Sequence, residues 1–399
     1  MQRMQLLSGN SIQGQGSETS RLRGAVGVFL FALVLSASAC RGGATAADSS
    51  DYGLGSARAL AAGEPIVERK VASMGTLATL RVWGQDRAAA LVSSEAALCA
   101  LEETEARLST WREDTELAQF NRLPVGQTLE LSGATTLELG RAVELARRTQ
   151  RAFDPGIGAL IDAWDLRGSG RVADADLVDE LLKCGGLDQL LLQGNSVSRR
   201  NEHLRLEEGG FGKGAGLELA LVALANSGAG RASIDMGGQL ALLSDGRPFL
   251  LSVADPRARQ RLVLNLVLDS GSLATTGNSE RLRDVDGQAI GHILDPRSGY
   301  PAHLESRGGN PRWAQSSASV WCQAALDADA LATAFFVMGP EEGLALAEQM
   351  PGVEAVFLVP VDSTRTNSPL DAHATSGLRG RTRALSAAIR LHFKEVQQQ

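Results

Sequence analysis

The sequence has no excess of positive charge. Its 399 residues contain 39 Lys and Arg against 46 Asp and Glu, which gives a formal net charge of −7 with neutral histidines. A protein that binds nucleic acid needs a basic surface to neutralise phosphates. The composition therefore argues against a nucleic-acid partner.

Cysteine is scarce, and the only apolar run of note is short. If Cys40 is lipidated, three of the four cysteines remain, an odd number that gives no complete disulfide framework, and nothing in their spacing suggests a metal site. In "RLRGAVGVFLFALVLSASAC" two arginines precede an apolar run over 24–35, and small residues then lead to Cys40. This is a secretory signal pattern, and "ASAC" resembles a bacterial lipoprotein cleavage box with Ala37 in place of the commoner Leu. We expect an exported, membrane-anchored lipoprotein acylated at Cys40 and facing the periplasm; plain secretion and a retained anchor stay open.

No internal repeat is present, and the polar segment after Cys40 lacks apolar periodicity, as expected of a tether. We predict a signal peptide over 1–39, a flexible tether over 40–65 and one folded domain over 66–395. Helical periodicity is expected at about 213–226, 329–338 and 341–349, and "VASMGTLATLRVWG" reads as one of many β-like runs. Because helices do not alternate with single strands, the fold class is α+β with mixed or antiparallel sheets.

The segment "LDADALATAFFVMG", residues 326–339, places two carboxylates at the start of an apolar helix. Asp is a good N-cap, and acidic residues suit the first turn of a helix. Thr333 follows Asp329 by four residues, so both oxygens share one helix face. Such hard oxygen donors suit Mg²⁺. Capping and metal binding both remain open from this segment alone.

The glycine run "GGFGKGAG", residues 209–216, enters a predicted helix and contains Lys213. Free backbone N–H groups and a lysine can cradle phosphate oxygens. The spacing is not that of a Walker A motif. Tight helix packing explains the glycines equally well.

The segment "GHILDPRSGYP" combines a histidine with Asp-Pro and Ser-Gly turn signals. His292 is a candidate base, and Asp295 a candidate catalytic carboxylate. In the alternative interpretation, His292 is a structural histidine and Asp295 caps the turn.

Taken together and in order, these segments resemble a known family, the ApbE-type FAD:protein FMN transferases. The resemblance runs from about Met74 to about Met350 and rests on the following motifs: "MGT", "LSTWREDTELAQFN", "FDPGIGALIDAW", "GFGKG", "MGGQL", "ATTGN", "HILDPRSGYP" and "DADALATAFFVMGPEEGLALAE". It implies an α+β fold that forms a single catalytic unit.

The resemblance also implies roles for individual residues. Mg²⁺ would be held by Asp329, Thr333 and the backbone carbonyl of Gly210, while His292 matches the histidine of a His-x-x-Asp-Pro motif. Residues implied to line the FAD site are Met74, Trp111, Ala152, Phe153, Asp154, Glu207, Lys213 and Leu294. Two positions depart from the family pattern, since Glu207 replaces a usual Asp and Ala215 a common aromatic residue.

The implied reaction is Mg²⁺-dependent transfer of FMN from FAD to a Thr or Ser hydroxyl of an acceptor protein, with release of AMP. The acceptor would carry a motif resembling Ser/Thr-Gly-Ala-Thr. This chain itself contains "LSGATT" at 131–136, where Ser132 is also a good N-cap for the helix that follows. Two alternatives remain, a Mg²⁺-dependent FAD pyrophosphatase that yields FMN and AMP, and a flavin-binding lipoprotein without turnover.

Overall fold

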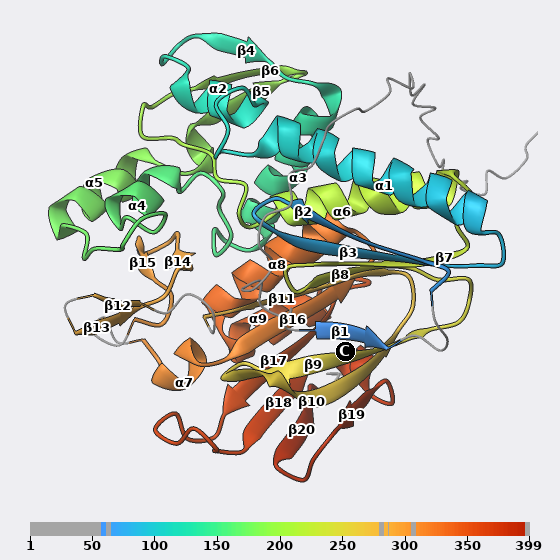
Figure 1. Cartoon of the computed structure of the whole chain (residues 1–399). Helices are drawn as coiled ribbons and strands as arrows, with labels where there is room; N and C mark the ends of the chain where they lie inside the picture. The colour runs from blue at the N-terminus through green and yellow to red at the C-terminus, as the bar shows by residue number, and fades with distance from the viewer. Residues whose placement is uncertain (1–56, 61–64, 279–282, 286, 305–308, 396–399) are drawn as a thin grey trace, which may run out of the picture. The chain divides into compact units, whose positions relative to one another are not determined.

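The computed structural model describes residues 57–60, 65–278, 283–285, 287–304 and 309–395 (Figure 1). The chain divides into two units, 1–46 and 47–399, and all described residues belong to the second. Cys40 and the predicted signal peptide lie outside the described residues. Within these ranges, no helix combines the length and the apolar character needed to span a bilayer.

Nine strands of the described chain form one sheet. Neighbouring strands are antiparallel except for the last pair, which is parallel. This mixed sheet, together with the helices, confirms the predicted α+β class. In spatial order the strands are β2 (Val67–Ser73), β3 (Thr76–Trp83), β7 (Arg231–Met236), β8 (Gln239–Leu243), β11 (Gly271–Gly277), β16 (Ser317–Cys322), β17 (Glu354–Pro360), β18 (Leu370–Ala374) and β20 (Ile389–Phe393).

A second sheet of four strands contains part of the predicted tether. Its strands are, in spatial order, β1 (Ala57–Leu60), β9 (Phe249–Asp255), β10 (Ala258–Leu268) and β19 (Thr382–Ala384). Strand β1 pairs antiparallel with β9. The sequence predicted that the folded domain starts at Ile66, whereas strand β1 of the structure lies before that residue.

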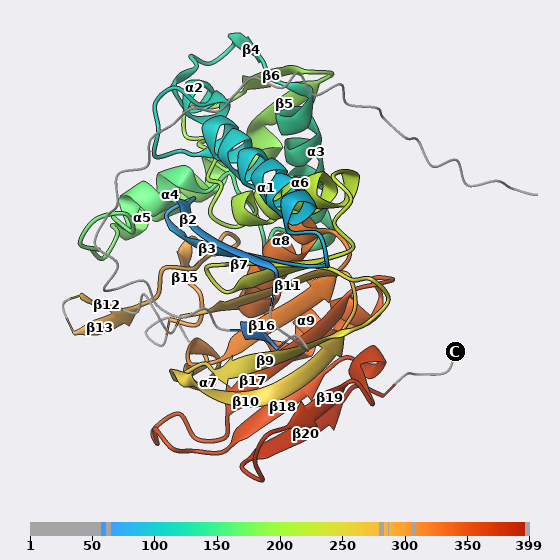
Figure 2. The ribbon, with the colours of Figure 1, turned by 45° about the vertical axis from the view of Figure 1, so that its right-hand side comes forward.

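Strand β17 of the nine-stranded sheet is buried on both faces. On β17, Val356 and Leu358 belong to a hydrophobic cluster with β9 and β10, whereas Phe357 and Val359 pack in a cluster with helix α8 (Ala325–Met338). Figure 2 shows the helices and the second sheet on opposite sides of this sheet. Burial on both faces explains why the sequence of β17 is a continuous apolar run rather than an alternating one.

Helices and small sheets complete the unit. Besides α8, the helices of the described chain are α1 (Arg87–Leu108), α2 (Glu116–Arg122), α3 (Gly133–Arg148), α4 (Gly158–Ala163), α5 (Ala175–Cys184), α6 (Gly212–Asn226), α7 (Pro311–Ala314) and α9 (Pro340–Glu348). Helix α6 packs against both α1 and α8. The remaining strands are β4 (Thr128–Glu130), β5 (Leu190–Gln193), β6 (Ser196–Arg199), β12 (Arg283–Val285), β13 (Gln288–Ile290), β14 (Leu294–Asp295) and β15 (Tyr300–Pro301).

Two local predictions have clear outcomes. Ser132 is the N-cap of α3, because its hydroxyl accepts a hydrogen bond from the Thr135 N–H at 3.3 Å. The segment predicted as one strand around Met74 is instead a hairpin. Met74 and Gly75 form its turn with φ of 48° and 69°. Positive φ at both central residues matches the twist of the flanking strands.

Candidate functional site

Helices α6 and α8 approach each other closely at Gly214. A Cβ added to Gly214 would lie 2.6 Å from the Cα of Leu326 and 2.8 Å from the carbonyl carbon of Ala325. These are backbone atoms of α8, so a side chain at this position could not be accommodated by a rotamer change. The structure therefore supports the interpretation of this glycine as a packing residue.

Lys213 and Asp329 meet beside this contact. The Nζ of Lys213 lies 3.2 Å from Oδ1 and 3.3 Å from Oδ2 of Asp329. The backbone N–H of Gly214 donates to Oδ2 at 3.0 Å. The Asp329 side chain is only 7% exposed, so its charge is held by these donors rather than by water.

The three residues predicted to hold Mg²⁺ are brought together. The Thr333 hydroxyl lies one turn from Asp329 and donates to its backbone carbonyl at 3.3 Å. A Cβ on Gly210 would lie 3.8 Å from Thr333 Oγ1 and 3.1 Å from the Phe153 ring. Carboxylate, hydroxyl and carbonyl oxygens are the ligands that Mg²⁺ accepts, with water and phosphate completing its shell. The donor set thus fits Mg²⁺, although no group of three or more His, Cys, Asp or Glu in the described ranges is arranged to hold a metal.

Asp327, the first of the two carboxylates in "LDADALATAFFVMG", is the one left for capping if Asp329 binds the metal, but it does not cap α8. The helix begins at Ala325, its N-cap is Ala324, and no side chain of the cap residue bonds to the first turn. Instead, Glu218 of α6 accepts a hydrogen bond from the Leu326 N–H at 3.2 Å. Asp327 pairs with Arg141 at 2.6 Å, and Arg141 also pairs with Glu218. Asp327 thus serves a charge network that joins α3, α6 and α8.

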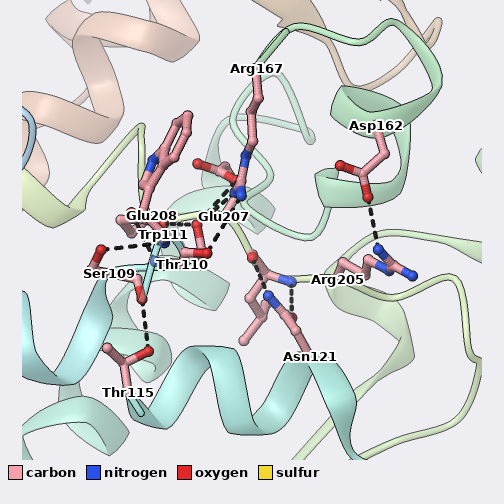
Figure 3. A network of polar contacts seen from close by, with 11 residues as sticks. Ser109, Thr110, Trp111, Thr115, Asn121, Asp162, Arg167, Arg205, Glu207 and Glu208 are labelled. Carbon is pink, nitrogen blue, oxygen red and sulfur yellow. Dashed lines mark hydrogen bonds and ion pairs between the residues drawn. The ribbon is translucent and has the colours of Figure 1, made fainter. Parts of the chain in front are cut away.

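Trp111 lies on a loop between α1 and α2 that is fixed at both ends (Figure 3). The Thr115 hydroxyl donates to the Ser109 carbonyl at 2.7 Å and accepts from the Ala118 N–H as N-cap of α2. The Asn121 amide pairs with both backbone groups of Leu206, at 2.9 and 2.7 Å. The loop that carries Trp111 is therefore tied to the segment that carries Glu207.

Arg167 connects Trp111 with the Glu207 carboxylate and the Thr110 hydroxyl. Its guanidinium lies over the indole ring, 4.9 Å from the centroid, while the ring remains 69% exposed. It also pairs with Glu207 and donates to the Thr110 hydroxyl at 2.6 Å. Burial raises the pKa of Glu207 to about 6, the Glu208 carboxylate adds to this rise, and the Arg167 guanidinium opposes it. An exposed aromatic face beside a cation is suited to a planar ligand.

The Asp154 carboxylate joins the backbone of its own loop to that of a distant segment at Leu187. Its side chain is fully buried and accepts hydrogen bonds from the N–H groups of Gly156 at 2.8 Å and Leu187 at 3.1 Å, and it pairs with Arg151. Burial raises the pKa of Asp154, whereas Arg151 and the two N–H groups lower it. Ala152 and Phe153, predicted with Asp154 to line the FAD site, are buried as well. The Phe153 ring lies close to Gly210, one of the residues predicted to hold Mg²⁺.

Met74 lies at the tip of the β2–β3 hairpin and reaches α6. Its backbone N–H donates to Glu105 at 3.0 Å, and its side chain is 3.6 Å from the position of a Cβ on Gly216. The hairpin tip is therefore held against the helix that begins beside Lys213.

His292 lies between β13 and β14. The adjacent Ile293 is buried in the same hydrophobic cluster as Phe153 and as Ala328 and Ala330, the two neighbours of Asp329. Leu294, predicted to lie along the FAD site, is buried in a separate cluster with Trp164.

Asp295 is engaged in its turn. Its carboxylate accepts from the Arg297 N–H at 2.9 Å and pairs with the Arg297 guanidinium at 3.0 Å. Its backbone carbonyl accepts from the Gly299 N–H at 2.8 Å. These contacts match the alternative in which Asp295 caps the turn, and its catalytic role stays a prediction.

Arg167, Arg141 and Glu218 were not predicted from the sequence. All three act through partners distant in the chain, such as Asp327, 186 positions from Arg141. Only Glu218 had a signal in the sequence. It lies four residues after Gly214, on the same face of α6.

The sequence and the fold of the chain are similar to those of known proteins. The model of the ApbE family matches residues 74–357. A relative from Treponema pallidum named FAD:protein FMN transferase is 29% identical over 336 residues, covering 79% of this chain and 88% of the relative. One of the same name from Vibrio cholerae is 30% identical over 258 residues, covering 62% and 74%.

Solved structures give the same result. The flavin transferase ApbE from Vibrio cholerae has a TM-score of 0.66 at 25% identity, covering 79% of this chain and 98% of that chain. The ApbE protein from Thermotoga maritima has a TM-score of 0.64 at 26% identity, covering 73% and 94%. Because the family model matches well over half of the sequence, the chain belongs to the ApbE family.

Proposed function

We propose that this protein is an FAD:protein FMN transferase that moves FMN from FAD to a Thr or Ser hydroxyl of an acceptor protein. The observation that carries the proposal is the meeting of Asp329 and Thr333 with Lys213 at the start of α6. Anion-binding groups and hard oxygen donors adjoin there, as a diphosphate with its metal ion requires. The names of the relatives support the same activity.

In the proposed reaction, the acceptor hydroxyl oxygen forms a bond to the FMN phosphorus. The bond from that phosphorus to the bridging oxygen breaks, and AMP leaves with the electron pair. Mg²⁺, when bound to Asp329, Thr333 and Gly210, would offset charge on the phosphate oxygens. Lys213 and the N-terminus of α6 bind phosphate, and His292 accepts the hydroxyl proton.

The flavin or adenine ring would be received by the exposed face of Trp111, with Met74 and Glu207 as further contacts. Arg167 holds Trp111 from one side and keeps the Glu207 carboxylate paired. The acceptor is expected to present a motif resembling Ser/Thr-Gly-Ala-Thr. Export and acylation of Cys40 complete the proposal and would place the reaction at a membrane surface facing the periplasm.

The test combines the purified protein with FAD, Mg²⁺ and a candidate acceptor. Covalent flavin on the acceptor and one AMP per flavin transferred are expected. If FMN and AMP appear in solution without labelling of the acceptor, the protein is an FAD pyrophosphatase instead. If no FMN or AMP forms, the protein binds flavin without turnover.

Two variants of α8 form a matched pair for this assay. Asp329→Asn keeps the shape of the side chain but removes its charge, so transfer should fall steeply and recover in part at high Mg²⁺. Asp327→Asn removes a charge from the same helix but only disturbs the pair with Arg141. Equal losses in both variants would contradict the assignment of Asp329 as a metal ligand.

A further inference from the structure

The ammonium group of Lys213 faces Asp329 where a metal ion would also have to bind. Its distances of 3.2 and 3.3 Å place it between the two carboxylate oxygens. It is also 3.4 Å from the backbone carbonyl of Gly209, the neighbour of Gly210. The chain's own cation therefore contacts the same carboxylate and the same stretch of backbone as the predicted metal.

Two cations cannot share this carboxylate easily. Asp329 is 7% exposed, and the Gly214 N–H already bonds to Oδ2 at 3.0 Å. Lys213 contacts both oxygens of the carboxylate, so a metal ion that binds both oxygens would compete with the ammonium. A divalent ion placed there would repel the ammonium with twice the force between single charges. Binding of the metal thus requires Lys213 to leave.

The Lys213 side chain can move away from Asp329, whereas helices α6 and α8 cannot move apart. Its side chain is 27% exposed and its ammonium sits on a flexible four-carbon stem. Helices α6 and α8 are held by the close contact at Gly214 and by the bond of Glu218 to the first turn of α8. An anion at the N-terminus of α6 would attract the ammonium away from Asp329.

We propose that Lys213 is an exchangeable counter-ion of Asp329, so that a dinucleotide diphosphate draws the ammonium away and opens the carboxylate to Mg²⁺. The inference rests on the proposed function for the identity of both ligands. Because binding free energies are linked, Mg²⁺ must in turn favour the lysine position that binds the diphosphate. The two ligands therefore bind cooperatively through one side chain.

The test is a calorimetric titration of MgCl₂ into FAD-free protein at constant ionic strength. In Lys213→Met the competitor is gone, so Mg²⁺ should bind about tenfold or more tightly than in the parent, within the usual range of coupling factors. Lys213→Arg keeps the charge and should show no such gain. Lys70→Met removes an exposed lysine paired with Glu68 and controls for net charge.

Circular dichroism verifies that each variant is folded, and Lys213→Gln replaces Lys213→Met if the latter is not. The gain in Mg²⁺ affinity should disappear when Asp329→Asn is combined with either variant. Unchanged or weaker Mg²⁺ binding by a folded Lys213 variant overturns the proposal. Its failure is separate from that of the proposed function, which is judged by FMN transfer in the parent protein.

Discussion

Gly214→Ala should destabilise the protein by about 2 kcal/mol. The new methyl group would meet the backbone of α8, 2.6 Å from the Cα of Leu326. Overpacking of this kind costs about 1–3 kcal/mol, and the upper end applies because backbone atoms cannot rotate away. Replacing Gly by Ala within a helix returns about 1 kcal/mol. Urea unfolding of the purified protein measures the difference.

Gly216→Ala, two residues further along α6, is the matched control. Its Cβ would lie 3.2 Å from the Leu101 side chain and 3.6 Å from that of Met74, both of which can move. The gain in helix propensity should then cancel the small packing cost, which leaves stability within about 0.5 kcal/mol of the parent. If the two variants unfold with equal free energies, the close approach of α6 to α8 does not constrain the fold as argued.

Four further predictions concern the site and the N-terminus. The pKa of Glu207 is raised to about 6 in the folded state. The contribution of protonated Glu207 to the free energy of unfolding is therefore complete below about pH 4.5 and is lost as the pH rises through 6. The loss should be about 2 kcal/mol in urea unfolding curves, and Glu207→Gln should remove this pH dependence. Arg167→Gln should weaken FAD binding roughly three- to tenfold, measured by calorimetric titration, since the Trp111 ring loses the guanidinium that lies over it; unchanged affinity would exclude this role. His292→Ala should slow FMN transfer by about 100-fold or more with much less effect on FAD affinity, the low end for a general base; equal losses would make it a positioning residue. Cys40→Ser should release the protein from membrane fractions, and an unmodified N-terminal peptide in the parent would contradict lipidation.

The sequence predicted the parts of the site that depend on local spacing. Asp329 and Thr333 share a helix face because they are four residues apart, and the glycine run does begin a helix. The start of α8 was predicted four residues late, since the residue that bonds to its first turn is Glu218 on another helix. Arg167 could not be predicted to lie over Trp111, because their contact depends on how two distant loops fold together.

The hairpin turn at Met74 was not predicted, for a different reason. Its φ of 48° is uncommon for a residue with a side chain, and a methionine gives no turn signal. Gly75 alone carried that information, but a single glycine within a β-like run is also compatible with a bulge.

The bond from Glu218 to the first turn of α8 has a consequence for the range of ligands that the site can accept. Together with the contact at Gly214, it fixes the distance between the backbones of the two helices. In the proposed function, adjustment to a larger or smaller diphosphate ester would come from side chains such as the flexible stem of Lys213. Tolerance toward unnatural flavin dinucleotides should then be limited by the reach of these side chains and not by movement of the helices.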